Sequence, residues 1–323
     1  SQTHRAWREQ DHPHLAAPLG LLVLLLALLA ARRRRFGVAQ VIGASLLVAA
    51  AIPAYMYGHI GLAFALAGAG EAVLLLAALR WSNIDLARAA ALTLAVIVFQ
   101  ALLGKWTVTL LLKPIIVMGH LLGGLATFSL LLWMAWRATG LPIRLADARW
   151  LRRWVIAGIV LLGVQIALGG WTSANYAALA CGGGGWTTAQ HHYLDFPRCV
   201  GQWWPPADFH EGFILWRGVG VDYEGGVLDG ASRIAIQMAH RMMAVVVAVY
   251  LLWLALRLYR LPGMRGWATA LGLLVVAQVS LGILNVKLAL PLSVAVLHNA
   301  GALALLFVLV TLLARLKEPE SVA

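Results

Sequence analysis

The chain has 323 residues, of which 62% are hydrophobic and 12% are charged, and its mean hydropathy is +0.83. Such a chain has too little polar surface to cover a water-soluble core, so the composition excludes a soluble globular protein and indicates an integral membrane protein. The formal net charge of +12 does not indicate nucleic-acid binding, because the basic residues gather on one side of the predicted membrane spans.

Nine apolar stretches approach or exceed the roughly 20 residues that a helix needs to cross about 30 Å of hydrocarbon. Only helices and closed barrels satisfy their backbone polar groups in lipid, and a barrel would show short alternating segments instead. The sequence therefore predicts an all-α integral membrane protein with about eight to nine transmembrane helices. The predicted spans are 7–31, 37–56, 59–80, 88–111, 114–138, 152–172, 233–257, 265–287 and 292–315.

The positions of the basic residues predict the orientation of these spans. Loops rich in arginine and lysine stay in the cytoplasm. This rule places the C-terminus in the cytoplasm and the long segment 173–232 outside. An odd number of spans then leaves the N-terminus outside, and because Ser1 is not methionine we expect further sequence upstream. The basic groups are 32–35, 137–153, 257–265 and 315–317.

The first predicted span opens with an ionisable pair. Glu9 and His12 are three residues apart, which places them on one face of a helix. Ionisable groups at the end of a membrane helix indicate function, although a solvated helix start is the alternative interpretation.

Residues 37–80 form an apolar hairpin that the second half of the chain lacks, with its turn expected between Pro53 and Gly58. His59, at this hairpin, is a rival to His12 as a functional histidine. It lies 61 residues before His120, close to the 58 residues that separate His240 from His298.

A repeated pattern organises the chain. The stretch 100–108 and the stretch 278–286 share the pattern Gln-x-x-Leu-Gly, each is followed by a proline and a histidine, and both intervals are 178 residues (278 − 100 and 298 − 120). A third, weaker copy begins at Gln165. The repeat predicts a pseudo-symmetric pair of helical bundles. We assign residues 1–138 to the N-terminal bundle and 139–323, including the outer loop, to the C-terminal bundle.

The two cysteines, Cys181 and Cys199, both lie in the outer segment 173–232. In an oxidising compartment such a pair most simply forms a disulfide, and a redox role is the alternative.

Four histidines are expected near the outer ends of their spans, two in each half: His12, His120, His240 and His298. Zinc would need further Cys, His or carboxylate ligands. Two imidazoles on opposite helices suit haem, whose porphyrin supplies four nitrogens itself. Arg241, next to His240, offers a cation for a propionate. The pattern predicts a membrane protein with two haem sites.

At these residues the sequence resembles the haem A synthase family of proteobacteria and mitochondria. The likeness covers about residues 88–315, while Pro13 and the hairpin 37–80 depart from the family pattern. The matching stretches are 100–120, 168–181, 195–199, 201–206, 240–241 and 291–299.

The resemblance implies that the protein oxidises the C8 methyl group of haem O to a formyl group. It implies that His240 and His298 hold a haem B cofactor, that His12 and His120 flank the haem O substrate, and that Glu9 handles protons or positions the substrate. It also matches Cys181 and Cys199 to cysteines of the family's outer loop. A non-catalytic diheme b-type electron-transfer cytochrome is the alternative; it would need the same histidines but not Glu9.

The expected location is a bacterial inner membrane, with multiple spans and a periplasmic cysteine-containing loop. The expected partners are a haem O-producing farnesyltransferase, cytochrome oxidase assembly factors, membrane lipid and a further copy of the chain. No nucleic-acid partner is expected.

Overall fold

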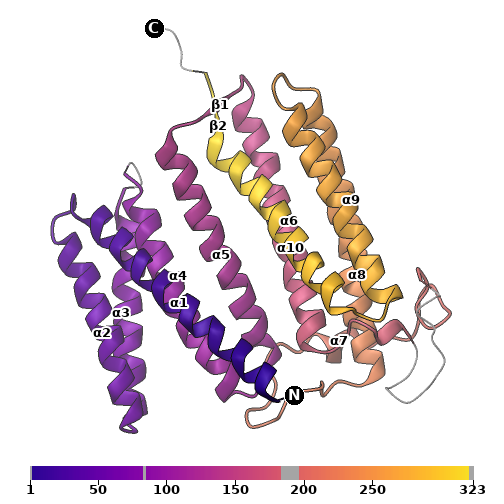
Figure 1. Ribbon diagram of the computed structural model, residues 1–323, viewed down its shortest axis with the longest axis horizontal. Helices are drawn as coiled ribbons and strands as arrows, with labels where there is room; N and C mark the ends of the chain where they lie inside the picture. The colour runs from indigo at the N-terminus through magenta and orange to yellow at the C-terminus, as the bar shows by residue number, and fades with distance from the viewer. Residues whose placement is uncertain (1, 83–84, 183–195, 320–323) are drawn as a thin grey trace. The chain divides into compact units, whose positions relative to one another are not determined.

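The computed structural model describes residues 2–82, 85–182 and 196–319, and it describes side chains from residue 16 onward. Within these ranges the protein is helical apart from two short paired strands and the connecting loops (Figure 1). The elements are α1 (Gln2–Ala31), α2 (Gly37–Met56), α3 (Ile60–Arg80), α4 (Ala87–Thr109), α5 (Pro114–Thr139), β1 (Ile143–Arg144), α6 (Ala148–Ala174), the 3-10 turn η1 (Ala180–Gly182), α7 (Phe209–Gly212), α8 (Gly230–Tyr259), α9 (Arg265–Lys287), α10 (Leu292–Arg315) and β2 (Leu316–Lys317).

The all-α membrane fold is confirmed. Among the described residues, eight helices are long and apolar enough to cross a membrane: α2 to α6 and α8 to α10. Their ends lie within about four residues of the predicted spans, because each apolar run is bounded by polar residues, glycine or proline that end a membrane helix. The predicted first span lies in α1, whose described apolar part is the shorter stretch Ala16–Ala31.

The hairpin turn lies at the Gly58 end of the predicted stretch, between the predicted spans 37–56 and 59–80. Pro53 lies inside α2, which continues to Met56, and the chain reverses at residues 57–59, where Gly58 adopts a φ of 81°. A proline so near the end of a helix removes only one backbone hydrogen bond, so it does not force the turn.

The chain divides into two compact units, and the first comprises residues 1–102 and 126–134. Here α2 and α3 pack closely, because Gly70 has no side chain. A Cβ at Gly70 would lie 2.7 Å from the backbone oxygen of Ala44 and 2.8 Å from Val48. Arg34 closes the end of this unit with an ion pair to Asp85 at 2.6 Å.

The second unit comprises residues 103–125 and 135–323 and contains a closed ring of four helices. In this ring α6 packs on α8, α8 on α9, α9 on α10, and α10 on α6. Figure 1 shows these four helices running alongside one another. Their order places α8 and α10 diagonally across the ring, so side chains directed inward from these two helices face a shared interior.

At one end of the second unit, polar contacts join the end of α5 and the loop after it to the end of α10. The strands β1 and β2 pair in parallel. Trp136 donates from its indole nitrogen to the Thr311 hydroxyl at 2.9 Å, and Arg315 donates to the backbone oxygen of Leu141 at 2.8 Å. These contacts hold the ends of α5 and α10 together.

The outer segment is attached to the other end of the second unit. Trp171 donates to the backbone oxygen of Gly212 at 2.9 Å. Lys113, whose side chain is buried, donates to the backbone oxygen of Arg217 at 2.6 Å and lies 3.4 Å from the centre of the Trp216 ring. A buried ammonium needs such partners to offset its lost hydration, so Lys113 fixes this part of the segment.

The cap of α8 gives a pH-dependent prediction for the fold. Asp229 accepts a hydrogen bond from the Ser232 backbone at 2.8 Å. Hydrogen bonds from Ser232 hold the pKa of this carboxyl below its usual value. The stability that the cap contributes is therefore present above the carboxyl's unfolded-state pKa and is lost as the pH falls through its lower folded-state pKa.

We expect Asp229→Ala to lower the melting temperature in detergent at pH 7, with the deficit shrinking as the pH falls below about 4. Asp229→Asn is the matched control, because asparagine caps helices without titrating. A deficit of Asp229→Ala that stays constant down to acid pH would contradict the assigned role.

Candidate functional site

Three of the predicted ligand histidines share one local arrangement. Each imidazole lies against a glycine on a neighbouring helix, and the glycine is the last residue of a Gln-x-x-Leu-Gly pattern. A Cβ on the glycine would approach the Cε1 atom of the ring to between 3.1 and 3.2 Å, which is closer than most real contacts of this kind. Each copy of the repeated pattern therefore provides a glycine at which an imidazole can pack against a helix backbone. The couples are Gly104 with His120, Gly169 with His240, and Gly282 with His298.

The glutamines of this pattern reach two of the same rings. The amide nitrogen of Gln165 lies 3.2 Å from Nδ1 of His240 and 3.2 Å from that residue's backbone oxygen. The amide nitrogen of Gln278 lies 3.5 Å from Nε2 of His298. Both glutamines come one turn before their glycine, so α6 and α9 each present a small residue and an amide to the histidine of the next ring helix.

His240 and His298 occupy the two diagonal helices of the ring. His240 is on α8 and His298 is on α10. Both side chains are partly buried. The two histidines that the sequence paired thus lie on helices that occupy diagonal positions in the ring.

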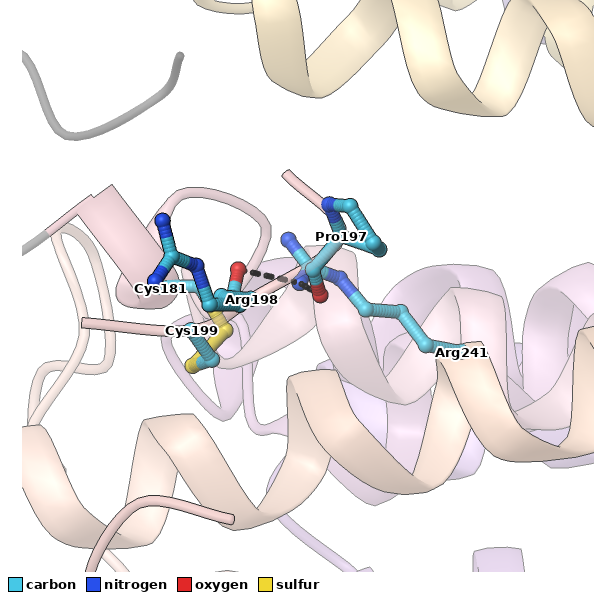
Figure 2. The surroundings of a disulfide bond; sticks show 5 residues. All are labelled: Cys181, Pro197, Arg198, Cys199 and Arg241. Atoms are coloured by element: carbon cyan, nitrogen blue, oxygen red, sulfur yellow. Dashed lines mark hydrogen bonds between the residues drawn. A yellow bond between two sulfur atoms is a disulfide. The ribbon is translucent and has the colours of Figure 1, made fainter. Parts of the chain in front are cut away.

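Arg241 connects this site to the disulfide. Cys181 and Cys199 form the predicted bond (Figure 2). The Arg241 guanidinium lies 3.5 Å and 3.4 Å from the backbone oxygens of Pro197 and Arg198, the two residues before Cys199. It also lies 5.0 Å from the centre of the Phe196 ring. The crosslink closes a loop that separates its cysteines by 18 residues, and it holds acceptors for the side chain that follows His240.

His120 also lies in the second unit, near the start of α5. This part of α5 packs against α6, where a Cβ on Gly170 would lie 3.0 Å from Leu121 and 3.6 Å from Met118. A buried cluster continues this contact into the outer segment and α8. Its members are Trp171, Ala177, Leu228 and Ile236, with Ile115, Met118 and Phe213 packed against them.

The remaining candidate site residues are Glu9, His12 and His59. Glu9 and His12 lie in α1, and their side chains fall outside the described part. His59 is exposed at the start of α3, in the first unit. The structure therefore does not choose between His12 and His59.

Sequence reasoning named the histidines but missed the role of the glutamines. The signal was present, because the Gln-x-x-Leu-Gly pattern was recognised three times. A repeat in the sequence does not show which side chain on a neighbouring helix each glutamine contacts. That meeting depends on the ring order of α6, α8, α9 and α10.

The residues around His240 and His298 fit a haem. The glycines remove side chains beside both imidazoles, and Nδ1 of His298 and Nε of Arg241 are buried without a hydrogen-bond partner among the described residues. Buried polar atoms of this kind are normally satisfied, so a ligand with a metal and carboxylates would complete the site. Within the described residues no group of three or more His, Cys, Asp or Glu side chains gathers as a metal site.

Comparison with known proteins gives a consistent family. The family model for cytochrome oxidase assembly proteins matches residues 55–310. The Heme A synthase of Shewanella oneidensis is 43% identical over 218 residues, covering 67% of this chain and 62% of that protein. The Heme A synthase of Caulobacter vibrioides is 31% identical over 233 residues, covering 68% and 60%. No solved structure matches the chain.

The matched range includes some of the candidate site residues and leaves others outside. The chain spans about three fifths of the length of both relatives. The matched range 55–310 contains His59, His120, His240 and His298, and it leaves Glu9 and His12 outside.

The glycine contacts predict the effect of a single methyl group. In Gly169→Ala the new Cβ would sit 3.2 Å from Cε1 of His240, so the imidazole must shift by a few tenths of an ångström or the helices must separate. We expect lower stability by about 1–3 kcal/mol, measured by denaturant unfolding in detergent.

Gly272→Ala, on α9, is the matched control, because no atom lies within 4 Å of its added Cβ. Alanine has a higher helix preference than glycine, so Gly272→Ala is not expected to lower the stability. An equal loss of stability in the two variants would show that the imidazole contact is not responsible.

Proposed function

This chain belongs to the cytochrome oxidase assembly protein family, and from that premise we propose that it is a haem A synthase, which oxidises the C8 methyl group of haem O to a formyl group. The observation that supports a haem site is the diagonal pair His240 and His298, each of which lies against a glycine of the repeated pattern. The names of the similar proteins support the same activity.

We assign the cofactor site to the ring of α6, α8, α9 and α10 in the second unit. His240 and His298 would hold haem B, each through a ring nitrogen, and Arg241 would pair with a propionate. When bound, haem B supplies one-electron transfer. The chain contributes the orientation of both rings, through Gly169 and Gly282, and the partial exclusion of water by the surrounding helices.

We assign the substrate half to His12 and His120, with Glu9 beside the reacting methyl group. A carboxylate placed there would take up or deliver protons as the C–H bond is oxidised. His120 has the same glycine contact as the two cofactor histidines, which supports a ligand role for it. His59 is the alternative to His12 as the N-terminal ligand, and it lies inside the matched family range.

The cellular setting is part of the same proposal. The eight apolar helices make this a multi-pass membrane protein. We propose that it lies in a bacterial inner membrane, with the C-terminus in the cytoplasm and the disulfide in the periplasm. Its proposed partners are the haem O-producing farnesyltransferase, cytochrome oxidase assembly factors and a further copy of the chain.

The activity is tested by extracting the haems from membranes that contain this protein and a haem O source. We expect haem A in the parent protein and its loss in Glu9→Ala, by about 100-fold or more if the carboxylate is the general acid or base. Haem B bound with haem O unchanged would contradict the proposal and would leave the non-catalytic diheme cytochrome as the function.

The same extraction distinguishes the two candidate N-terminal ligands. We expect His12→Ala to abolish haem A formation and His59→Ala to retain it, with haem B present in both. The reverse result would transfer the ligand role to His59.

A further inference from the structure

The contact between Gln165 and His240 has a role that neither the family nor the similar proteins assign. We propose that Gln165 is a positioning residue for a metal-bound His240, and that its side-chain amide sets the redox potential of the haem held there. This inference rests on the proposed haem B site and deepens it.

The first step is the identity of the ring nitrogen. Gln165 meets Nδ1 of His240, so Nε2 is left to face a metal. The pair on the opposite helix differs, because the amide of Gln278 lies against Nε2 of His298 at the longer distance of 3.5 Å. The two glutamines are therefore not equivalent, and the assignment concerns Gln165.

The second step is the direction of the hydrogen bond. An imidazole bound to iron through Nε2 carries its remaining proton on Nδ1 and needs an acceptor for it. The Gln165 oxygen is such an acceptor. It is buried and makes no hydrogen bond among the described residues, while the amide nitrogen occupies the place beside Nδ1. Turning the amide group over would bring the oxygen to Nδ1 without moving the helix, and it would give up the hydrogen bond that the amide nitrogen donates to the backbone oxygen of His240 at 3.2 Å.

The third step is the fixed position of this amide. Gln165 lies one turn before Gly169 on α6, and that glycine holds the same imidazole at its Cε1 edge. The ring of His240 is thus set by two residues of one helix. A partner that accepts from a metal-bound imidazole makes the ligand more basic, which stabilises ferric over ferrous iron and lowers the potential.

The test is a redox titration of the bound haem B in purified full-length protein, using two substitutions with opposite expected signs. Gln165→Glu supplies an anionic acceptor and lowers the potential, whereas Gln165→Leu removes the acceptor and raises it. We expect each to change the ratio of ferric to ferrous affinity by about tenfold, which is about 59 mV for a one-electron couple. We also expect Gln165→Leu to weaken haem binding about 10-fold to 100-fold.

Two further variants provide comparisons. Gln40→Leu, at an exposed glutamine of α2, is expected to leave the potential unchanged. Gln278→Leu is expected to shift it less than Gln165→Leu, because its amide is farther from the ring and meets the other nitrogen.

Unchanged potentials in both Gln165 variants, shifts of the same sign, or an equal shift in Gln278→Leu would overturn the inference. Loss of haem from Gln165→Glu as well as Gln165→Leu, with haem kept in Gln40→Leu, would also overturn it, because glutamate retains an acceptor. Absence of haem B from the parent protein would instead refute the proposed function, so the two failures are distinguishable.

Discussion

The close approach of an imidazole to a helix backbone is the constraint on which the candidate site depends. At Gly104, Gly169 and Gly282 a single methyl group would fall between 3.1 and 3.2 Å from a histidine ring. Interiors packed at protein density have little room to absorb such a contact, so these three positions fix the distance between neighbouring helices as well as the direction of the rings. The repeated Gln-x-x-Leu-Gly pattern reflects this requirement for a glycine at each contact.

The rest of the second unit holds these helices in register. The ring closes because α10 packs on α6, and at one end the side chains of Trp136 and Arg315 tie α5 to α10. At the other end the outer segment is held by the buried side chain of Lys113 and by the disulfide, whose neighbouring carbonyls accept from Arg241. These contacts hold the C-terminal end of α10 and the N-terminal part of α8, the helices that carry His298 and His240.

The sequence predicted the membrane helices well, because an apolar run of about 20 residues has one stable solution in lipid. It included Gly58 in the predicted hairpin turn, although Pro53, at the other end of that stretch, is tolerated in the last turn of α2. The paired histidines and the disulfide were also within reach of the sequence, through an internal repeat and a pair of cysteines in one loop. The contacts of Gln165 and Gln278 were not, because they depend on which helices become neighbours.

The central proposal is that His240 and His298 would together hold one haem. Low-temperature electron paramagnetic resonance of the purified oxidised protein tests it most directly, with His210→Ala, at an exposed histidine of α7, as the control. In protein prepared without a haem O source, so that no substrate haem lies between His12 and His120, the account predicts a low-spin signal from a haem with two imidazole ligands, kept in His210→Ala and lost in both His240→Ala and His298→Ala. That signal persisting in a protein that carries both substitutions would contradict the account.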